Sequence, residues 1–167
     1  PFIMVQIGKY HDTVDDVSHW KSIQYQQIAL PESIGNLECV ASIDLEMDDL
    51  IHIGVEGFRR LGKRLARMAD RLVYGNTLEP APPKPLSARR IVPGRRYLNE
   101  VWAVDVRVGN VVGHLESDGI DGGFTFVDRD DRPLPLIYRS SLRGDTVRVE
   151  AMNRNSTGDL RIAYGAG

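Results

Sequence analysis

Cysteine is scarce in this chain of 167 residues, which contains a single one, Cys39. A lone thiol cannot form an internal disulfide, and its place in the apolar run "LECVASI" predicts a buried side chain. Long apolar runs are lacking too: no stretch approaches the roughly 20 residues that a membrane-spanning helix needs, and no signal-peptide pattern is present. We therefore expect neither a disulfide framework nor a membrane partner.

An excess of charge of either sign is missing as well. The formal net charge is -2 at pH 7, from 21 Lys and Arg against 23 Asp and Glu. This balance gives no reason to expect nucleic acid as a partner. The apolar content of 42% and the charged content of 26% are typical of a globular protein. A chain of this length can hold one ordinary domain or two small ones.

Before residue 75 the sequence alternates between strand and helix patterns. The runs "FIMVQI" and "LECVASIDL" are short and apolar, which predicts buried strands over about residues 2–7 and 38–44. Helical spacing predicts helices over about residues 15–30 and 54–73. Strand, helix, strand, helix with short joints indicates a parallel α/β sheet.

The two helices should each bury one apolar face. In the first, Trp20 is expected in the core and Pro31 as the stop. The residues at helical spacing are Val17, Trp20, Ile23, Gln27 and Leu30. The expected apolar face of the second consists of Val55, Phe58, Leu61, Leu65, Ala69 and Leu72. Its basic residues favour a solvated outer face; they are Arg59, Arg60, Lys63, Arg64, Arg67 and Arg71.

The character of the chain changes after residue 75. Residues 76–86 contain the proline-rich stretch "EPAPPKP", which predicts a semi-rigid linker. From residue 86 the sequence should form strands almost entirely, because short runs such as "GGFTFVD" and "DTVRVEAM" lie between turn residues. We therefore expect an α/β part at residues 1–75 and a small all-β, sandwich-like part at 87–167.

A histidine with nearby carboxylates lies between the second strand and the second helix. In open parallel sheets ligands bind at the carboxyl ends of the strands, where this loop must lie. Asp49 is three residues before His52, so its carboxylate can hold the imidazole in the tautomer that a general base needs. Asp48 is the second candidate for this role, whereas Asp44 is expected to be structural or a cap. The alternative is that Asp48 or Asp49 caps the helix and His52 lies exposed in its first turn.

A nucleophile for this base is not evident. The sequence has no Gly-x-Ser-x-Gly elbow and no Gly-Asp-Ser motif after a strand, and Ser42 is expected within a strand. A chain with an oriented base but no nucleophile is either not a hydrolase or not the whole of one. The start inside an apparent strand and the end directly after another suggest that both ends are cut.

Several motifs together resemble the C-terminal part of sialate O-acetylesterase-like enzymes of the SGNH (GDSL-type) hydrolase family. They are "PFIMVQIG", "W-x-x-I-Q-x-Q-Q" at Trp20 to Gln27, Ile51-His52, "GKRLA" at 62–66, "VYG" at 73–75, "LRGDTVRVEA" and "LRIAYGAG". The resemblance implies part of a three-layer α/β/α fold, with His52 and Asp49 as two members of a catalytic triad. Ile53 stands where the family often has proline.

The resemblance also implies an activity, the hydrolysis of acetyl esters on sugars, with no metal or organic cofactor. The serine, and the Gly and Asn that complete the oxyanion hole, lie in the family's N-terminal portion, so we expect them on chain that precedes Pro1. The expected partners are an acetylated carbohydrate and that N-terminal portion, which would also cover the open sheet edge.

Two other functions fit the residues. The chain could be a non-catalytic carbohydrate-binding or docking β-module with a degenerate α/β half. It could also be a metal-dependent hydrolase that uses His52, His11 and the carboxylates of "KYHDTVDD" (9–16), although sequence alone shows no converging ligand geometry there.

Overall fold

The computed structural model describes residues 1–11, 18–91, 101–117, 123–130, 132–152 and 160–164. It divides into two compact units, Pro1–Glu79 (unit 1) and Pro80–Gly167 (unit 2). Unit 1 contains β1 (Phe2–Val5), α1 (Ser18–Ser33), β2 (Leu37–Val40) and α2 (Val55–Leu72). Unit 2 contains β3 (Lys84–Ile91), β4 (Val101–Gly109), β5 (Phe124–Val127), β6 (Pro133–Leu134), β7 (Ile137–Arg143), β8 (Thr146–Met152) and β9 (Arg161–Tyr164).

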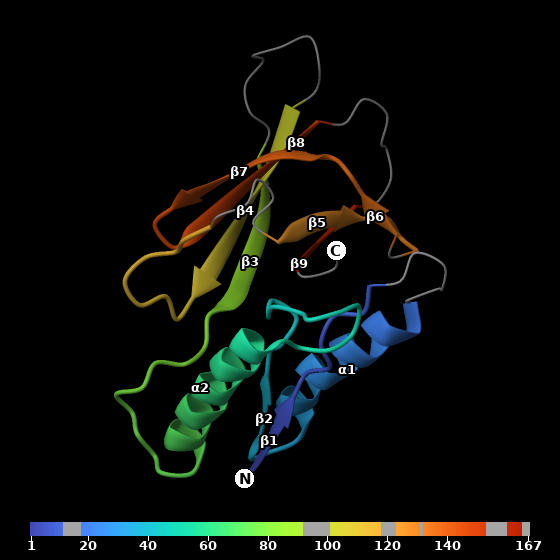
Figure 1. Cartoon of the computed structure of the whole chain (residues 1–167). Helices are drawn as coiled ribbons and strands as arrows, with labels where there is room; N and C mark the ends of the chain where they lie inside the picture. The colour runs from blue at the N-terminus through green and yellow to red at the C-terminus, as the bar shows by residue number, and fades with distance from the viewer. Residues whose placement is uncertain (12–17, 92–100, 118–122, 131, 153–159, 165–167) are drawn as a thin grey trace. The chain divides into compact units, whose positions relative to one another are not determined.

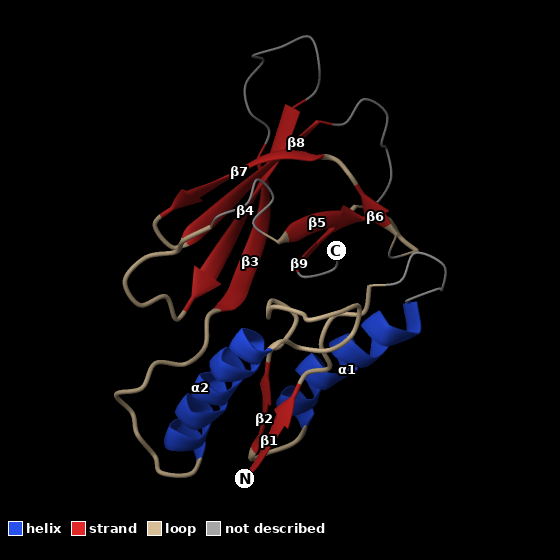
Figure 2. Ribbon diagram, viewed as in Figure 1, coloured by secondary structure: helices blue, strands red, loops and turns tan. Residues whose placement is uncertain are grey.

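In unit 1 the strands β1 and β2 pair in parallel, with Phe2 opposite Leu37 and Val5 opposite Val40. Figure 2 shows the two strands lying between the two helices. The core on the α2 side contains Val40, Leu45, Leu61 and Met68, with Ile3, Val5, Ile53 and Leu65 packed against them. The predicted α/β class is therefore confirmed, and its parallel pairing places the carboxyl ends of both strands at one edge.

The buried stripe of α2 differs from the predicted face. Val55 and Phe58 are 65% and 60% exposed, while Gly57, Leu61 and Met68 are buried. Gly57 faces the loop that precedes the helix, since a Cβ atom there would lie 2.7 Å from the carbonyl oxygen of Glu46. Because this glycine allows close backbone approach, the helix is turned so that Gly57 rather than Phe58 faces inward.

Helix α1 also departs from the prediction. It continues past Pro31 to Ser33, because a proline in the last turn removes only its own N–H bond and little helix follows it. Ile23 and Leu30 are exposed rather than buried, whereas Gln24 is buried and Trp20 is partly buried against Tyr10 at a ring-centroid distance of 5.2 Å. The side of α1 that contacts the chain after β1 is therefore largely polar. Val17 lies outside the described residues.

Strand β2 ends at Val40, four residues earlier than predicted. Ser42 thus lies beyond the strand and not within it. It is fully buried, and its hydroxyl donates a hydrogen bond of 2.6 Å to the carbonyl oxygen of Gln6. Cys39, predicted to be buried, is partly buried; desolvation raises the pKa of its thiol.

Unit 2 consists of strands in its described residues, as the sequence predicted (Figure 1). One sheet has the order β3-β4-β8-β7 and is antiparallel throughout; the other has the order β6-β5-β9. Strand β3 begins at Lys84, so the last three residues of the expected linker, 84–86, are strand.

The core of unit 2 lies between its two sheets. Trp102, Val104 and Val106 from β4 and Val147, Val149 and Ala151 from β8 form one side, and Phe126 of β5 packs against them. The ring centroids of Trp102 and Phe126 are 4.6 Å apart. Buried residues alternate with polar ones along β8, which is the period of a strand with one solvated face.

Candidate active site

The segment between β2 and α2, residues 41–54, forms a hairpin-like loop at the carboxyl end of β2. Met47 and Ile53 pair as an isolated antiparallel bridge. The N–H of Asp48 donates to the carbonyl oxygen of His52 at 2.9 Å, and the N–H of Gly54 donates to that of Glu46 at 2.8 Å. These bonds set residues 49–51 as the tip of the loop, with His52 at its base.

Asp49 and His52 form the predicted hydrogen bond. The Oδ2 atom of Asp49 lies 2.7 Å from Nδ1 of His52. The other carboxylate oxygen, Oδ1, accepts hydrogen bonds from the backbone N–H groups of Ile51, at 2.9 Å, and His52, at 2.7 Å. One carboxylate therefore shapes the turn and orients the imidazole at the same time. Both side chains are open to solvent, with exposed fractions of 76% for His52 and 53% for Asp49.

These contacts determine the charge of Asp49. The hydrogen bond from the His52 ring, followed by those from the backbone N–H groups of Ile51 and His52, lowers the pKa of Asp49 to about 2. An ionised carboxylate can only accept, so Nδ1 of His52 carries the shared proton. Nε2 is then the ring nitrogen that can take a proton from a nucleophile, which is the arrangement of a general base in a triad.

The structure also distinguishes Asp49 from Asp48. Helix α2 begins at Val55 with Gly54 as its N-cap, and no side-chain hydrogen bond is made at this cap. His52 therefore precedes the helix instead of lying in its first turn. The carboxylate of Asp48 lies against Gly54, where a Cβ atom would be 2.5 Å from Oδ1. A negative charge there is favoured by the helix N-terminus.

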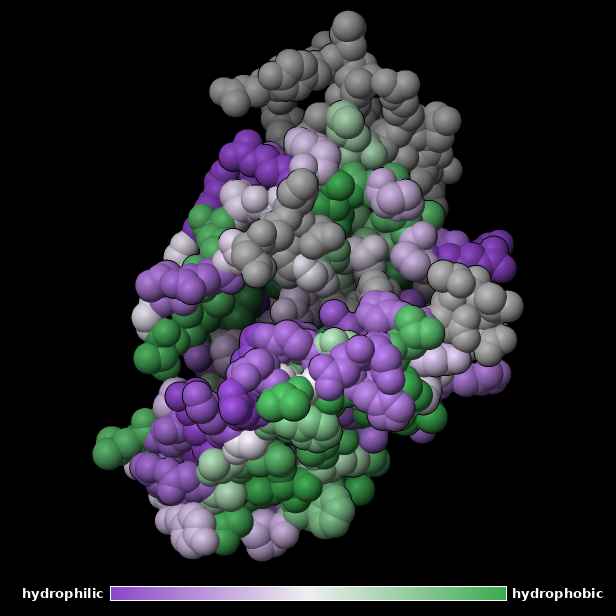
Figure 3. Space-filling view, viewed as in Figure 1, coloured by the Kyte–Doolittle hydropathy of each residue, from purple (hydrophilic) through white to green (hydrophobic). Residues whose placement is uncertain are grey.

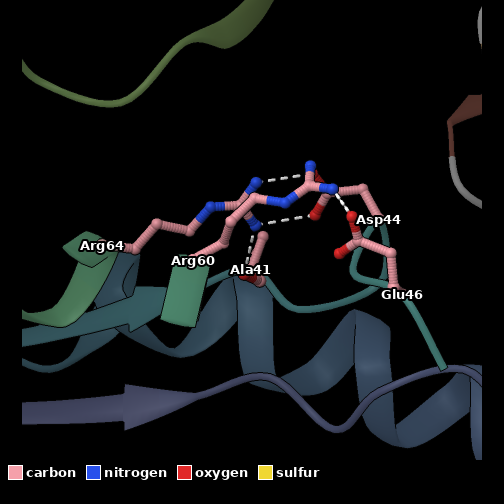
Figure 4. Close-up of polar contacts among 5 residues, drawn as sticks. All are labelled: Ala41, Asp44, Glu46, Arg60 and Arg64. Carbon is pink, nitrogen blue, oxygen red and sulfur yellow. Dashed lines mark hydrogen bonds and ion pairs between the residues drawn. The ribbon is translucent and has the colours of Figure 1, made fainter. Parts of the chain in front are cut away.

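Asp44 is held by α2, as expected for a structural residue. Its two carboxylate oxygens accept hydrogen bonds from Nη1 and Nη2 of Arg64, at 2.7 and 2.5 Å (Figure 4). Nη1 also donates a hydrogen bond to the carbonyl oxygen of Ala41 at 2.8 Å. Partial burial opposes ionisation of Asp44, but the hydrogen bond and charge of Arg64 outweigh it, so the pKa of Asp44 lies below its ordinary value.

Of the six basic residues of α2, Arg64 and Arg71 are partly buried and the other four are exposed as predicted. Four of the six form ion pairs. Arg64 pairs with Asp44, Arg60 with Glu46, Arg59 with Glu56, and Arg67 with Glu79. The partners Asp44 and Glu46 belong to the loop that carries His52, so two of these pairs connect the helix to the loop (Figure 4). Sequence reasoning missed these connections.

A second set of contacts fixes the chain after β1. Trp20 Nε1 donates to the carbonyl oxygen of Gly8 at 2.8 Å, and Gln24 Nε2 donates to the same oxygen at 2.6 Å. Gln27 Oε1 accepts the N–H of Ile7 at 2.7 Å. The "W-x-x-I-Q-x-Q-Q" motif of α1 therefore holds the segment that leaves β1.

The loops that follow the two strands meet at the carboxyl edge. The N–H of His11 donates to the carbonyl oxygen of Leu50 at 2.8 Å, and Ser42 bonds to Gln6 as described above. The tip that carries Asp49 is therefore supported from the segment after β1 as well as from α2. The position predicted for the dyad, at the edge where parallel sheets bind ligands, is the observed one.

The described residues contain no group of three or more His, Cys, Asp or Glu side chains placed to hold a metal ion. Asp12, Asp15 and Asp16 of the "KYHDTVDD" stretch lie outside them. A second histidine–carboxylate pair occurs in unit 2, where Nε2 of His114 lies 2.9 Å from Oε1 of Glu116. The sequence showed no partner pattern for His114. Neither helix is long and apolar enough, in its described residues, to cross a membrane.

With this geometry in place, comparison with known proteins gives two findings. Residues 1–71 match the family model described as carbohydrate esterase, sialic acid-specific acetylesterase. The resemblance seen in the motifs is thus confirmed for this part of the chain, which includes Asp49 and His52. No curated protein sequence matches the chain.

The second finding concerns the fold. The chain is similar to the crystal structure of a carbohydrate acetylesterase from Xanthomonas citri, with a TM-score of 0.66 and 21% sequence identity. The match covers 98% of this chain and 35% of the other, so the chain spans about a third of the length of that esterase. At this identity the likeness shows a shared fold.

Proposed function

We propose that the chain is part of a serine-type carbohydrate O-acetylesterase of the SGNH class, in which His52 acts as general base and acid and Asp49 is the carboxylate that orients it. One observation carries the proposal. The 2.7 Å hydrogen bond between Asp49 and His52 lies in the segment that matches a carbohydrate esterase family, on the loop after a parallel strand. Exposure of the ring supports it, because a general base must reach substrate.

The proposed reaction follows the order of other serine hydrolases. A serine hydroxyl oxygen bonds to the acetyl carbonyl carbon while its proton passes to Nε2 of His52. The bond from that carbon to the sugar oxygen then breaks, and this oxygen takes the proton from His52. Water repeats the sequence on the acyl-enzyme and releases acetate. Asp49 stays ionised throughout and stabilises the imidazolium that forms twice in the cycle.

The serine and the oxyanion hole are proposed to come from residues outside this chain. Ser42, which lies in this loop, is buried, and its hydroxyl donates a hydrogen bond to the carbonyl oxygen of Gln6, which makes it a poor nucleophile. The chain matches 35% of the similar esterase, and the serine and the oxyanion hole are proposed to belong to the part that corresponds to the remainder.

Apolar surface on unit 1 gives this proposal further support. Phe2, Ile28, Leu30 and Ile34 are exposed, and Figure 3 shows apolar side chains gathered around β1. Large exposed apolar patches mark binding surfaces, and β1 pairs with β2 alone in the described residues. Further parallel strands added at its open edge would cover this surface and extend the sheet into the proposed three-layer fold.

The proposal is tested on the full-length protein with an acetylated sugar and with p-nitrophenyl acetate. His52→Ala should lower kcat by roughly four to six orders of magnitude, because triad members act as a unit. Asp49→Asn should lower it by about 10⁴, since an amide no longer holds the correct tautomer.

The matched controls are His114→Ala and Glu116→Gln. They remove the histidine–carboxylate pair of unit 2, whose histidine is as exposed as His52. Both should leave kcat unchanged. Unchanged turnover in His52→Ala, with its fold intact by circular dichroism, would reject the proposed catalytic role and favour the carbohydrate-binding interpretation.

A further inference from the structure

Two arginines of α2 hold the first half of the loop that carries the dyad. Arg64 donates to both carboxylate oxygens of Asp44 and to the carbonyl oxygen of Ala41. Arg60, one turn earlier on the helix, forms an ion pair with Glu46. Figure 4 shows both guanidinium groups extending from α2 to this segment of the loop. The segment 41–46 is thus attached to the helix at three residues by side-chain contacts.

The second half of the loop is attached to the first through backbone contacts. Glu46 accepts the N–H of Gly54, and Met47 pairs with Ile53. A displacement of Asp44 and Glu46 from α2 would therefore disturb these contacts and shift residues 47–53, including His52, while Gly54 stays joined to the helix as its N-cap. By contrast, the three hydrogen bonds that Asp49 accepts all come from within residues 49–52. The dyad itself is local and does not need α2.

We propose that Arg64, assisted by Arg60, is a positioning residue: it fixes where the Asp49–His52 pair lies on unit 1, and so its distance from the reacting serine. The inference rests on the proposed function. It assigns no contact with substrate to either arginine. Their effect passes through Asp44 and Glu46 to the loop, and a misplacement of about 1 Å in an active site can cost about a hundredfold in rate.

The geometry at Arg64 requires a guanidinium. Nη1 and Nη2 form two parallel bonds to one carboxylate, and Nη1 donates a third bond to the main chain. The single ammonium of a lysine keeps the charge but cannot reproduce this planar fork. Arg64→Lys should therefore behave more like Arg64→Ala than like the wild type, which separates positioning from a simple effect of charge.

The kinetic test uses the full-length protein. Arg64→Ala and Arg64→Lys should lower kcat about ten- to a hundredfold with KM changed less than about threefold, because the substrate contacts stay while the base is misplaced. Asp44→Asn, which keeps only part of the fork, should lower kcat in the same direction by less. Arg59→Ala and Arg67→Ala are the matched controls, since they break ion pairs of the same helix that do not involve the loop. Both should retain wild-type kcat.

Amide hydrogen exchange on the same variants gives a readout that does not depend on activity. Arg64→Ala should speed exchange at Asp48 and Gly54, whose N–H groups close the loop, by about tenfold or more, while the amides of α2 stay protected. Nuclear magnetic resonance of the His52 ring should still show its bond to Asp49.

The outcomes separate the two proposals. Unchanged exchange in Arg64→Ala, or faster exchange with wild-type kcat, overturns the positioning role. Loss of protection along α2 as well would mean that Arg64 stabilises the whole unit, which also overturns it. A wild type without esterase activity instead rejects the proposed function, and the exchange result then still decides whether Arg64 holds the loop.

Discussion

Asp49 accepts three hydrogen bonds, and these have different consequences. Two come from the backbone N–H groups of Ile51 and His52 and fix the turn; the third comes from the imidazole and fixes the ring. Because the same carboxylate does both, the direction of the His52 side chain is tied to the conformation of its own main chain. A residue that orients a base in this way needs no help from distant chain, but it must remain ionised.

The ionisation of Asp49 can be measured directly. Its pKa of about 2 lies below the ordinary value of 3.8, so its stabilising contribution is complete above about pH 3.8 and is lost as the pH falls through about 2. We expect the nuclear magnetic resonance signal of the Asp49 side-chain carboxyl carbon to titrate near pH 2 in the folded protein. At pH 4 the bond to the His52 ring should still be present.

The same resonance in urea-unfolded protein provides the control, since it should titrate near the ordinary value of 3.8. A folded-state midpoint that stays close to that of the unfolded chain would show that the three hydrogen bonds are not maintained in solution. His52→Ala should raise the midpoint part of the way, because the ring is the largest cause of the shift.

At the scale of the element, α2 contains two glycines with opposite surroundings. A Cβ atom on Gly57 would lie 2.6 Å from Cγ2 of Ile53 and 2.7 Å from the carbonyl oxygen of Glu46. A Cβ atom on Gly62, which is exposed, would have nothing within 4 Å among the described residues. Glycine is thus required at the first position for close approach to the loop and is dispensable at the second.

The same substitution should therefore have opposite effects at these two sites. Gly57→Ala should lower the free energy of unfolding by about 1–3 kcal/mol, because overpacking forces the loop away from the helix. Gly62→Ala should raise it by about 0.5–1 kcal/mol, because alanine loses less backbone entropy in a helix. Urea unfolding followed by circular dichroism measures both. If Gly57→Ala were neutral or stabilising, α2 would not contact the loop as the structure shows.

The sequence predicted elements where one physical signal dominates. A short β-branched run between turn residues predicts the strand at "DTVRVEAM", and apolar spacing predicts the four-element order of unit 1; both are observed. The prediction failed where the partner surface is polar or absent. The spacing in α1 placed Trp20 and Gln27 on the inner side correctly, but it also placed Ile23 there, which is exposed. Gln24, which was not predicted, is buried and donates to two carbonyl oxygens of the chain after β1. Hydrophobic period cannot reveal a helix that packs through amide groups.

The candidate site also contains one contact that the sequence could predict and one that it could not. The bond between Asp49 and His52 could be predicted because the residues are three apart and the turn brings them together without other chain. The pair of Arg64 with Asp44 joins residues 20 apart, and its formation depends on how α2 lies against the loop. That orientation in turn depends on Gly57, whose packing role no periodic pattern indicates.

For the molecule as a whole, each unit has a hydrophobic core made from its own residues. Leu61 and Met68 lie in the core of unit 1, and Phe126 and Val149 lie in that of unit 2. The candidate site belongs entirely to unit 1, since Asp44, Asp49, His52 and Arg64 all precede Pro80. Stability of the site should therefore depend on one core more than on the other.

Core truncations in the two units test this dependence. Phe126→Ala should destabilise unit 2 by about 3–5 kcal/mol, and Met68→Ala should destabilise unit 1 by about 2–5 kcal/mol, since both side chains are almost fully buried. Hydrogen exchange resolved by residue measures the two units separately. Met68→Ala should speed exchange in β2, in α2 and at Asp48 and Gly54 of the loop, whereas Phe126→Ala should speed exchange in β4, β5 and β8 and leave those loop amides protected. Equal loss of protection in both units from Phe126→Ala alone would show that the two cores unfold as one, and that the loop carrying the dyad depends on the β-rich unit as well.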